Sequence, residues 1–219
     1  MKPAFPSVYA ILTADLVTGD ESAIARTLAN AGVGLIQYRD KAASSRTLFE
    51  KSARIAHALA GSDVRLIVND RPDIACLVGA GGTHVGQEDL AVEDARAVCG
   101  EAASGDTGAS SFWVGVSTHT LDQVGEAAET SADYIAVGPI FPTRTKKQSD
   151  PVVGTDFIRR ARKLTTKPLV AIGGITVARA LEVLRAGANC VAVASDLIGA
   201  ADPAARAREY LGIAASCCK

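Results

Sequence analysis

The sequence has little of several features that would point to a particular class of protein. It has one Trp and one Met, and aromatic residues make up 5% of its 219 positions. No stretch approaches the ~18 consecutive apolar residues of a membrane span, and residues 1–5 lack the apolar core of a secretory leader. Neither charge sign dominates, since 23 Lys and Arg stand against 24 Asp and Glu. We therefore expect a soluble cytoplasmic protein with no nucleic-acid or membrane partner.

The five cysteines form no CxxC pair. Cys76, Cys99 and Cys190 lie in apolar patterned segments, where a free thiol behaves as a small hydrophobic side chain. Because cytoplasmic thiols stay reduced, we expect all five cysteines to be reduced. Cys217 and Cys218 are expected to be exposed in a disordered tail over residues 212–219.

The sequence repeats one pattern eight times: a short apolar run, a polar or glycine-containing turn, and a segment with helical periodicity. The predicted strands are Ser7–Thr13, Gly34–Arg39, Val64–Asp70, Gly82–Gly86, Phe112–Thr118, Tyr134–Ile140, Pro168–Gly174 and Cys190–Ser195. The predicted helices are Glu21–Ala31, Ser45–Ala60, Pro72–Gly79, Val92–Cys99, Leu121–Ser131, Asp156–Leu164, Val177–Ala186 and Pro203–Leu211. Eight similar units favour one single-domain (β/α)8 TIM barrel over a doubly wound sheet. Residues 100–111, which are mostly small and polar, are expected to form a flexible surface insertion.

Polar side chains gather where the predicted strands end. In a TIM barrel these ends lie on one rim and carry the active site. Asp70 and Asp89 would meet there from neighbouring strands, and with Asn69 they suit Mg²⁺, which prefers oxygen ligands and binds phosphate oxygens. An alternative role for Asp89 is to cap the helix that follows it.

Cations and glycines on the same rim predict two phosphate sites. Arg39, Lys41 and Lys146 exceed what a single carboxylate substrate needs and match a diphosphate. Gly173–Gly174 and Ser195 end the last two strands, which is the usual phosphate position in such barrels. Glycine allows the backbone N–H groups to approach an oxyanion closely.

Seven sequence segments lie in order at the spacing of barrel strands. They are QYRDK (37–41), VNDRPD (68–73), GTHVGQED (82–89), GVSTHT (115–120), DYIAVGPIFPTRTKK (133–147), AIGGI (171–175) and VAVAS (191–195). Together they resemble the thiamine phosphate synthase family over nearly the whole chain. The resemblance implies a transferase that condenses 4-amino-2-methyl-5-hydroxymethylpyrimidine diphosphate with hydroxyethylthiazole phosphate. The expected products are thiamine phosphate and pyrophosphate, formed by a Mg²⁺-assisted dissociative displacement.

The resemblance also implies roles for individual residues, with Asp70 and Asp89 as the Mg²⁺ ligands. The residues that it places at the pyrimidine diphosphate are Gln37, Arg39, Lys41, Asn69, Ser117 and Lys146. Tyr38 and Asp40, in the same segment as Arg39, are expected to bind substrate as well. Those that it places at the thiazole phosphate are Thr143, Arg144, Thr145, Gly174, Ala194 and Ser195. The catalytic side chains among them are Lys146, Arg39, Lys41 and Ser117. Such catalysis stabilises a leaving group and positions two substrates, so no nucleophilic side chain is expected.

Three positions depart from the family pattern. Arg144 stands where Pro is frequent, and Cys190 stands where Gly is frequent. Asp196 adds a negative charge beside the second phosphate site. We expect Asp196 to turn away from that site or to cap the next helical segment.

The histidines leave one alternative function open. His57 is expected to be solvated, and His84 is expected to line the core with a hydrogen bond. His119 lies on the rim, where it would serve as an acid or base, and this makes a thiazole tautomerase-like isomerase the first alternative. The two aspartates stand against it, because that reaction needs no metal-held diphosphate. A non-catalytic phosphate-binding barrel is the second alternative, and the sequence is compatible with a homo-oligomer.

Overall fold

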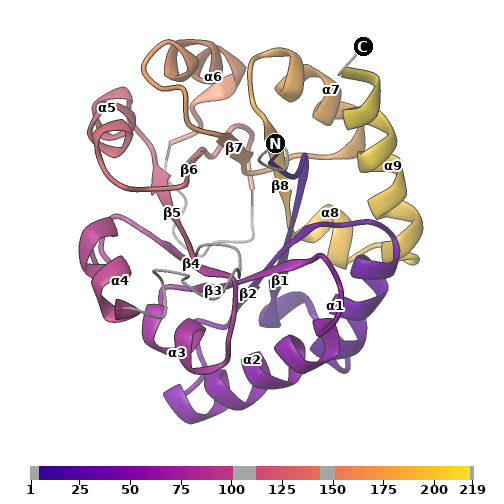
Figure 1. The fold of residues 1–219 in the computed structure, drawn as a ribbon. Helices are drawn as coiled ribbons and strands as arrows, with labels where there is room; N and C mark the ends of the chain where they lie inside the picture. The colour runs from indigo at the N-terminus through magenta and orange to yellow at the C-terminus, as the bar shows by residue number, and fades with distance from the viewer. Residues whose placement is uncertain (1–4, 101–111, 144–150, 218–219) are drawn as a thin grey trace.

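The structure, a computed structural model, describes residues 5–100, 112–143 and 151–217. Eight parallel strands form a closed barrel in chain order, with β8 paired to β1, and helices surround it (Figure 1). The strands are β1 (Val8–Thr13), β2 (Leu35–Arg39), β3 (Arg65–Asn69), β4 (Gly82–Val85), β5 (Trp113–Thr118), β6 (Tyr134–Val137), β7 (Leu169–Ile172) and β8 (Cys190–Val193). The main helices are α1 (Glu21–Asn30), α2 (Ser45–Leu59), α3 (Pro72–Leu77), α4 (Val92–Val98), α5 (Leu121–Glu129), α6 (Gly154–Arg162), α7 (Val177–Arg185) and α9 (Pro203–Cys217). The predicted (β/α)8 barrel is confirmed.

Alternation along the strands divides the buried side chains into two layers, because successive residues of a strand point to opposite faces. In β1, Val8 and Leu12 pack in the large cluster between the sheet and the helices, while Tyr9 packs inside the barrel. The buried members of the interior cluster are Tyr9, Ile11, Leu35, Ile67, Tyr134, Ala136, Val170, Cys190 and Ala192. Since both faces are covered, most residues of the strands are apolar, and polar residues such as Gln37 and His84 are the exceptions that line the cavity.

Two features of the interior depend on residue size. A Cβ atom at Gly115 would overlap the ring of Tyr134, so glycine at this position of β5 makes room for the aromatic side chain of β6. Cys190 is fully buried at the start of β8, and burial raises the pKa of its thiol. Cys190 therefore has a packing role within the barrel.

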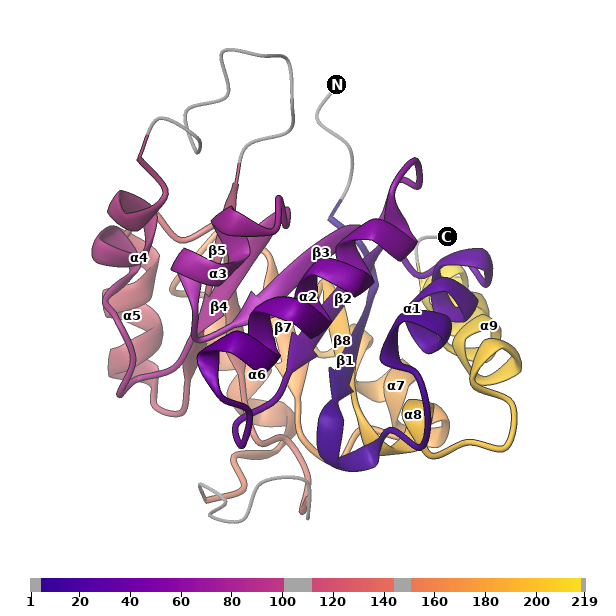
Figure 2. The same ribbon diagram turned by 90° about the horizontal axis from the view of Figure 1, so that it is seen from below.

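The sequence pattern did not predict two short helices, η1 (Ala14–Leu16) and α8 (Ser195–Ile198), which directly follow β1 and β8. Figure 2 shows the barrel from the side, with these two segments near the end at which β1 and β8 finish.

The expectation that the chain is disordered after Leu211 is wrong for residues 212–217. Helix α9 continues to Cys217 and buries Ala214, because apolar side chains of its last turns still meet the core.

The expectation that all cysteines are reduced is wrong for one pair. Cys76 of α3 and Cys99, which follows the last residue of α4, form a disulfide with their Cα atoms 5.9 Å apart. The two residues are 23 positions apart, so no local motif announces the pairing, and it arises because α3 and α4 pack side by side. Cys190 and Cys217 are free thiols, the first buried and the second exposed.

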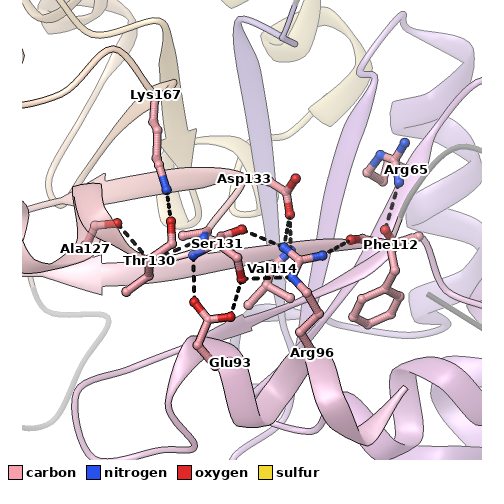
Figure 3. Close-up of polar contacts among 12 residues, drawn as sticks. Arg65, Glu93, Arg96, Phe112, Val114, Ala127, Thr130, Ser131, Asp133 and Lys167 are labelled. Carbon is pink, nitrogen blue, oxygen red and sulfur yellow. Dashed lines mark hydrogen bonds and ion pairs between the residues drawn. The ribbon is translucent and has the colours of Figure 1, made fainter. Parts of the chain in front are cut away.

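The barrel rim at which the strands begin is held by a polar network around Arg96 of α4 (Figure 3). Arg96 donates to the carbonyl oxygen of Phe112 at 3.1 Å and to that of Ser131 at 2.7 Å. It also forms an ion pair with Asp133 at 2.8 Å. Glu93 accepts hydrogen bonds from the backbone N–H and the hydroxyl of Ser131, both at 2.7 Å. The network fastens α4 to the starts of β5 and β6, on the rim that serves stability in TIM barrels.

No helix within the described ranges is long and apolar enough to cross a membrane. The expected surface insertion at residues 100–111 lies outside the described residues, apart from Gly100.

Candidate active site

A cavity of about 1090 Å³ opens at the rim where the eight strands end. The sequence-predicted residues that line it are Gln37, Arg39, Lys41, Asn69, Asp70, Asp89, Ser117, Thr143, Gly174, Ala194 and Ser195. The fold thus brings together side chains that are up to about 160 positions apart in the chain. Arg144, Thr145 and Lys146 lie outside the described residues.

Tyr38 and Asp40, expected at the substrate, are not part of the cavity wall. The side chain of Tyr38 is fully buried between the sheet and the helices, and its hydroxyl donates to the carboxylate of Asp40 at 3.3 Å. Lys51 of α2 forms an ion pair with the same carboxylate at 3.4 Å. The cause is strand alternation, because Gln37 and Arg39 face the cavity and the residue between them must face outward.

Asp70 and Asp89 meet at the ends of β3 and β4. Lys41 forms an ion pair with Asp70 at 2.6 Å. Burial raises the pKa of Asp70, the ion pair with Lys41 opposes this, and the neighbouring carboxyl of Asp89 raises it further. Asp70 also has a positive φ of 61°, a conformation that costs energy for a residue with a side chain and occurs often at functional sites.

Asp89 does not cap the following helix. Helix α4 begins at Val92, its N-cap is Ala91, and no side chain caps it. Instead the carboxylate of Asp89 accepts a hydrogen bond from the backbone N–H of Gly86 at 2.8 Å, which holds the turn after β4.

These residues supply only part of the coordination shell of a hard divalent cation and do not form a complete metal site by themselves. Among the described residues, no group of three or more His, Cys, Asp or Glu could hold a metal ion. Two adjacent carboxylates whose charges disfavour each other, with the amide of Asn69 on the same wall, offer oxygen ligands that leave positions for water and phosphate oxygens. Mg²⁺ is the ion that such an incomplete oxygen site suits.

A chain of hydrogen bonds crosses the floor of the cavity. Gln37 donates to the hydroxyl of Tyr9 at 2.7 Å, and the hydroxyls of Tyr9 and Tyr134 lie 2.9 Å apart. His84 bonds through Nδ1 to the Tyr134 hydroxyl at 3.1 Å and through Nε2 to Ser117 at 2.9 Å. Burial raises the pKa of both tyrosines, so they stay protonated and act through their hydroxyl groups.

Sequence reasoning predicted His84 as a core-lining residue with a hydrogen bond, and this is confirmed. It missed Tyr9 and Tyr134, which lie within apolar runs and look like ordinary core residues. The sequence feature that identifies Tyr9 is its spacing along the strand. Every second residue of a strand points to the same side, so Tyr9, Ile11 and Thr13 all face the cavity.

The ends of β7 and β8 form the other side of the cavity. Gly173 and Gly174 both have positive φ, at 101° and 61°, and a Cβ atom at Gly174 would overlap the carbonyl oxygen of Pro142. Glycine is therefore required at this turn, where the backbone approaches the loop after β6. Ala194 and Ser195 follow the neighbouring strand β8, at the start of α8, and also line the cavity.

The charge of Asp196 is compensated by α9. Its carboxylate accepts a hydrogen bond from Tyr210 at 2.7 Å and forms an ion pair with Arg206 at 2.9 Å. The expectation that Asp196 turns away from the phosphate site or caps the next helix is wrong, because Asp196 lines the cavity and α8 has no side-chain cap; its charge is paired instead with Arg206. His119 also lines the cavity, and its Nδ1 lies 2.6 Å from the carbonyl oxygen of Gly138, which fixes the ring orientation.

Comparisons with known proteins agree with one another. The family model described as "Thiamine monophosphate synthase" matches residues 8–197. A thiamine-phosphate synthase of Koribacter versatilis (strain Ellin345) is 44% identical over 213 residues, 95% of each chain. One of Chloroflexus aurantiacus is 38% identical over 203 residues, 92% of this chain and 89% of that one. A solved structure, thiamine phosphate pyrophosphorylase from Pyrococcus furiosus, is similar with a TM-score of 0.83 at 30% identity over 97% of both chains.

Proposed function

Since the chain belongs to the thiamine monophosphate synthase family, we propose how its cavity binds the two substrates of that reaction. The enzyme condenses a pyrimidine methyl diphosphate with a thiazole phosphate and releases pyrophosphate. We assign the pyrimidine diphosphate to the side formed by β2 to β5 and the thiazole phosphate to the side formed by β6 to β8. The observation that carries this assignment is the pair of carboxylates, Asp70 and Asp89, beside Lys41 at the edge of one cavity.

The pyrimidine ring is assigned to the floor of the cavity. Gln37 and Ser117 end the hydrogen-bond chain through Tyr9, Tyr134 and His84. Their amide and hydroxyl groups are therefore held in place before the ring binds, which reduces the entropy lost on binding. Asn69 on the same wall is assigned to the diphosphate.

Asp70 and Asp89 are assigned to Mg²⁺. When bound, the ion supplies positive charge that stabilises the negative charge growing on the departing pyrophosphate. Further cationic groups around the same leaving group come from Lys41, Arg39 and Lys146. Hydrogen bonds between charged groups and phosphate are stronger than those between neutral groups. As the C–O bond breaks, these side chains stabilise the transition state more than the ground state, which is what raises kcat.

The thiazole phosphate is assigned to the backbone around Gly174, Ala194 and Ser195, together with residues 143–145. Gly173 and Gly174 line the cavity, and backbone N–H groups at such a glycine turn before a helix are suited to bind phosphate oxygens. The thiazole nitrogen then captures the pyrimidine methyl cation across the cavity. The residues position both substrates, and no side chain forms a covalent bond.

The chain's mixed charge supports a wider proposal. We infer that the partners of the protein are small phosphorylated molecules rather than nucleic acid or membrane, since its formal net charge is −1. The tautomerase alternative is not favoured, because the named relatives are synthases and the carboxylate pair has no role in that isomerisation.

Release of pyrophosphate from the two substrates tests the proposal directly. We expect turnover with Mg²⁺, none after chelation, and restoration when Mg²⁺ is returned in excess. Asp89→Asn should lower kcat by about two orders of magnitude or more, because the metal site loses one of its two carboxylates. Asp63→Asn, at an exposed position with no role in the cavity, is the matched control and should keep full activity. Undiminished turnover of Asp89→Asn in chelator would refute the metal assignment.

A further inference from the structure

Arg179 lies in the first turn of α7, directly after the glycine turn that ends β7. Its Nη1 donates a hydrogen bond to the carbonyl oxygen of Gly174 at 2.8 Å. Its guanidinium also stacks on the ring of Phe141, with Cζ 4.5 Å from the ring centroid. Phe141 belongs to the loop after β6, so one exposed side chain contacts two rim loops and is held on the wall of the cavity.

The position of this cation is unfavourable for the helix itself. Unpaired N–H groups and the helix dipole make the first turn of a helix positive, so cations are preferred at the other end. Thr176, the N-cap of α7, makes no side-chain cap hydrogen bond. Within the described part of the chain, Arg179 forms no ion pair with a carboxylate. Helix α7 therefore concentrates positive charge at the cavity.

One carboxylate of the same cavity that could neutralise this charge is already engaged. Asp196, which also lines the cavity, is bound by Arg206 and Tyr210 of α9. A guanidinium has five N–H donors, and Gly174 takes one of those of Arg179. Its planar fork matches the geometry of phosphate oxygens, so an anion bound at the Gly174 turn would find further donors beside it.

We propose that Arg179 binds the phosphate of the thiazole substrate and makes this site selective for the phosphorylated thiazole over the free alcohol. The inference rests on the proposed function and adds a specificity-determining residue to it. Gly174 and Phe141 fix the guanidinium in place, and the backbone N–H groups of the turn bind the same phosphate. The unfavourable placement at the helix start is then relieved by the substrate.

Calorimetry with hydroxyethylthiazole phosphate and with the unphosphorylated alcohol tests this assignment. Arg179→Met should weaken binding of the phosphate by about 10- to 100-fold, the equivalent of losing charge-assisted hydrogen bonds. Binding of the alcohol should change less than about twofold, because the alcohol lacks the group that Arg179 contacts. Arg179→Lys should lie between the two, since it keeps the charge and loses the planar fork.

Three controls keep the result interpretable. Arg185→Met removes a cation from the last turn of the same helix, at an exposed position, and should leave both affinities unchanged. The affinity for pyrimidine diphosphate with Mg²⁺ and the melting temperature of Arg179→Met should also match the wild type. Phe141→Leu removes the stacking but keeps the cation, so it should weaken phosphate binding less than Arg179→Met does.

The outcomes separate the inference from the function on which it rests. If the wild type binds the thiazole phosphate and Arg179→Met binds it equally well, the inference is refuted while the function stands. If Arg179→Met weakens the phosphate and the alcohol by the same factor, Arg179 is a structural clamp and not a specificity residue. If the wild type neither binds the thiazole phosphate nor releases pyrophosphate, the proposed function fails and the inference fails with it.

Discussion

At the scale of single residues, the hydroxyl of Tyr134 joins the two halves of the cavity floor. It bonds to Tyr9, which holds Gln37, and to His84, which holds Ser117. Because it is fully buried, its loss would leave two polar groups short of a partner where water does not replace it. The positions of two proposed substrate contacts thus depend on one residue that is not itself part of the cavity wall.

Replacing this hydroxyl should affect both stability and binding. Tyr134→Phe is expected to lower the free energy of unfolding by about 1–3 kcal/mol, the cost of unsatisfied buried polar groups, as measured in urea. It should also weaken pyrimidine diphosphate binding, since Gln37 and Ser117 lose their support. Tyr38→Phe is the matched control, because its buried hydroxyl bonds outside the cavity, to Asp40 and Glu21. Equal pyrimidine affinities for the wild type and Tyr134→Phe would contradict the positioning role.

Single residues also show what the sequence could predict about the site. Asp70 and Asp89 were predictable because polar residues after apolar strands stand out, and the barrel places all strand ends on one rim. Tyr38 was placed at the substrate by its neighbours in the QYRDK segment, although strand alternation turns it the other way. The contacts of Arg179 depend on how two loops approach each other, which no local pattern reveals.

At the scale of elements, the contact between Glu93 and Ser131 fastens α4 to the connection between α5 and β6 (Figure 3). Hydrogen bonds from the side chain and backbone of Ser131 lower the pKa of Glu93 in the folded state. A carboxyl whose pKa is lower folded than unfolded adds stability above its unfolded pKa, about 4.3 for Glu. That contribution is lost as the pH falls below this value and through the lower folded-state pKa.

A pH series on Glu93→Gln tests this sign. The wild type should be more stable than Glu93→Gln at neutral pH. The difference in the free energy of unfolding, measured in urea, should shrink as the pH falls below the unfolded pKa of about 4.3. Activity of the variant should match the wild type, because the contact lies on the rim opposite the cavity. A difference that grew at low pH would show that the pKa of Glu93 is raised in the fold instead.

The disulfide between Cys76 and Cys99 is an element-scale feature that fixes α3 to the end of α4. Closing a loop with a sequence separation of 23 is expected to stabilise the fold by about 3 kcal/mol, mainly through the entropy of the unfolded chain. Thiol titration of the unfolded, unreduced protein should find three of the five cysteines. Dithiothreitol should lower the stability of the wild type and leave that of Cys99→Ser unchanged, whereas five titratable thiols without reductant would contradict the pairing.

Elements differ in how well the sequence predicted them. Strands and long helices have a hydrophobic period that local sequence carries, and their predicted bounds differ from the observed ones by a few residues at most, except at the end of α9. Helices η1 and α8 are too short to show a period. The disulfide depends on two helices lying side by side, which is a property of the closed barrel and not of either segment.

At the scale of the whole molecule, the barrel closes where the last strand, β8, pairs with the first, β1. Helix α9 covers this seam by packing on α1, α7, α8 and β1. Its Tyr210 is fully buried, and the hydroxyl donates to Asp196 at 2.7 Å and lies 3.2 Å from the carbonyl oxygen of Ile175, so α9 also supports the rim at which β7 and β8 end. Closure, and with it the second side of the cavity, therefore depends on the last helix.

Truncation at two positions tests how far this dependence extends. A chain ending at Leu211 loses the last turns of α9, including the buried Ala214 and the half-buried Ile213, which packs on the core. We expect the free energy of unfolding to fall by about 1–2 kcal/mol, the value of that apolar burial. A chain ending at Cys217 keeps these contacts and should be as stable as the full chain. If the two truncated chains unfolded at the same urea concentration, residues 212–217 would contribute nothing to closing the barrel.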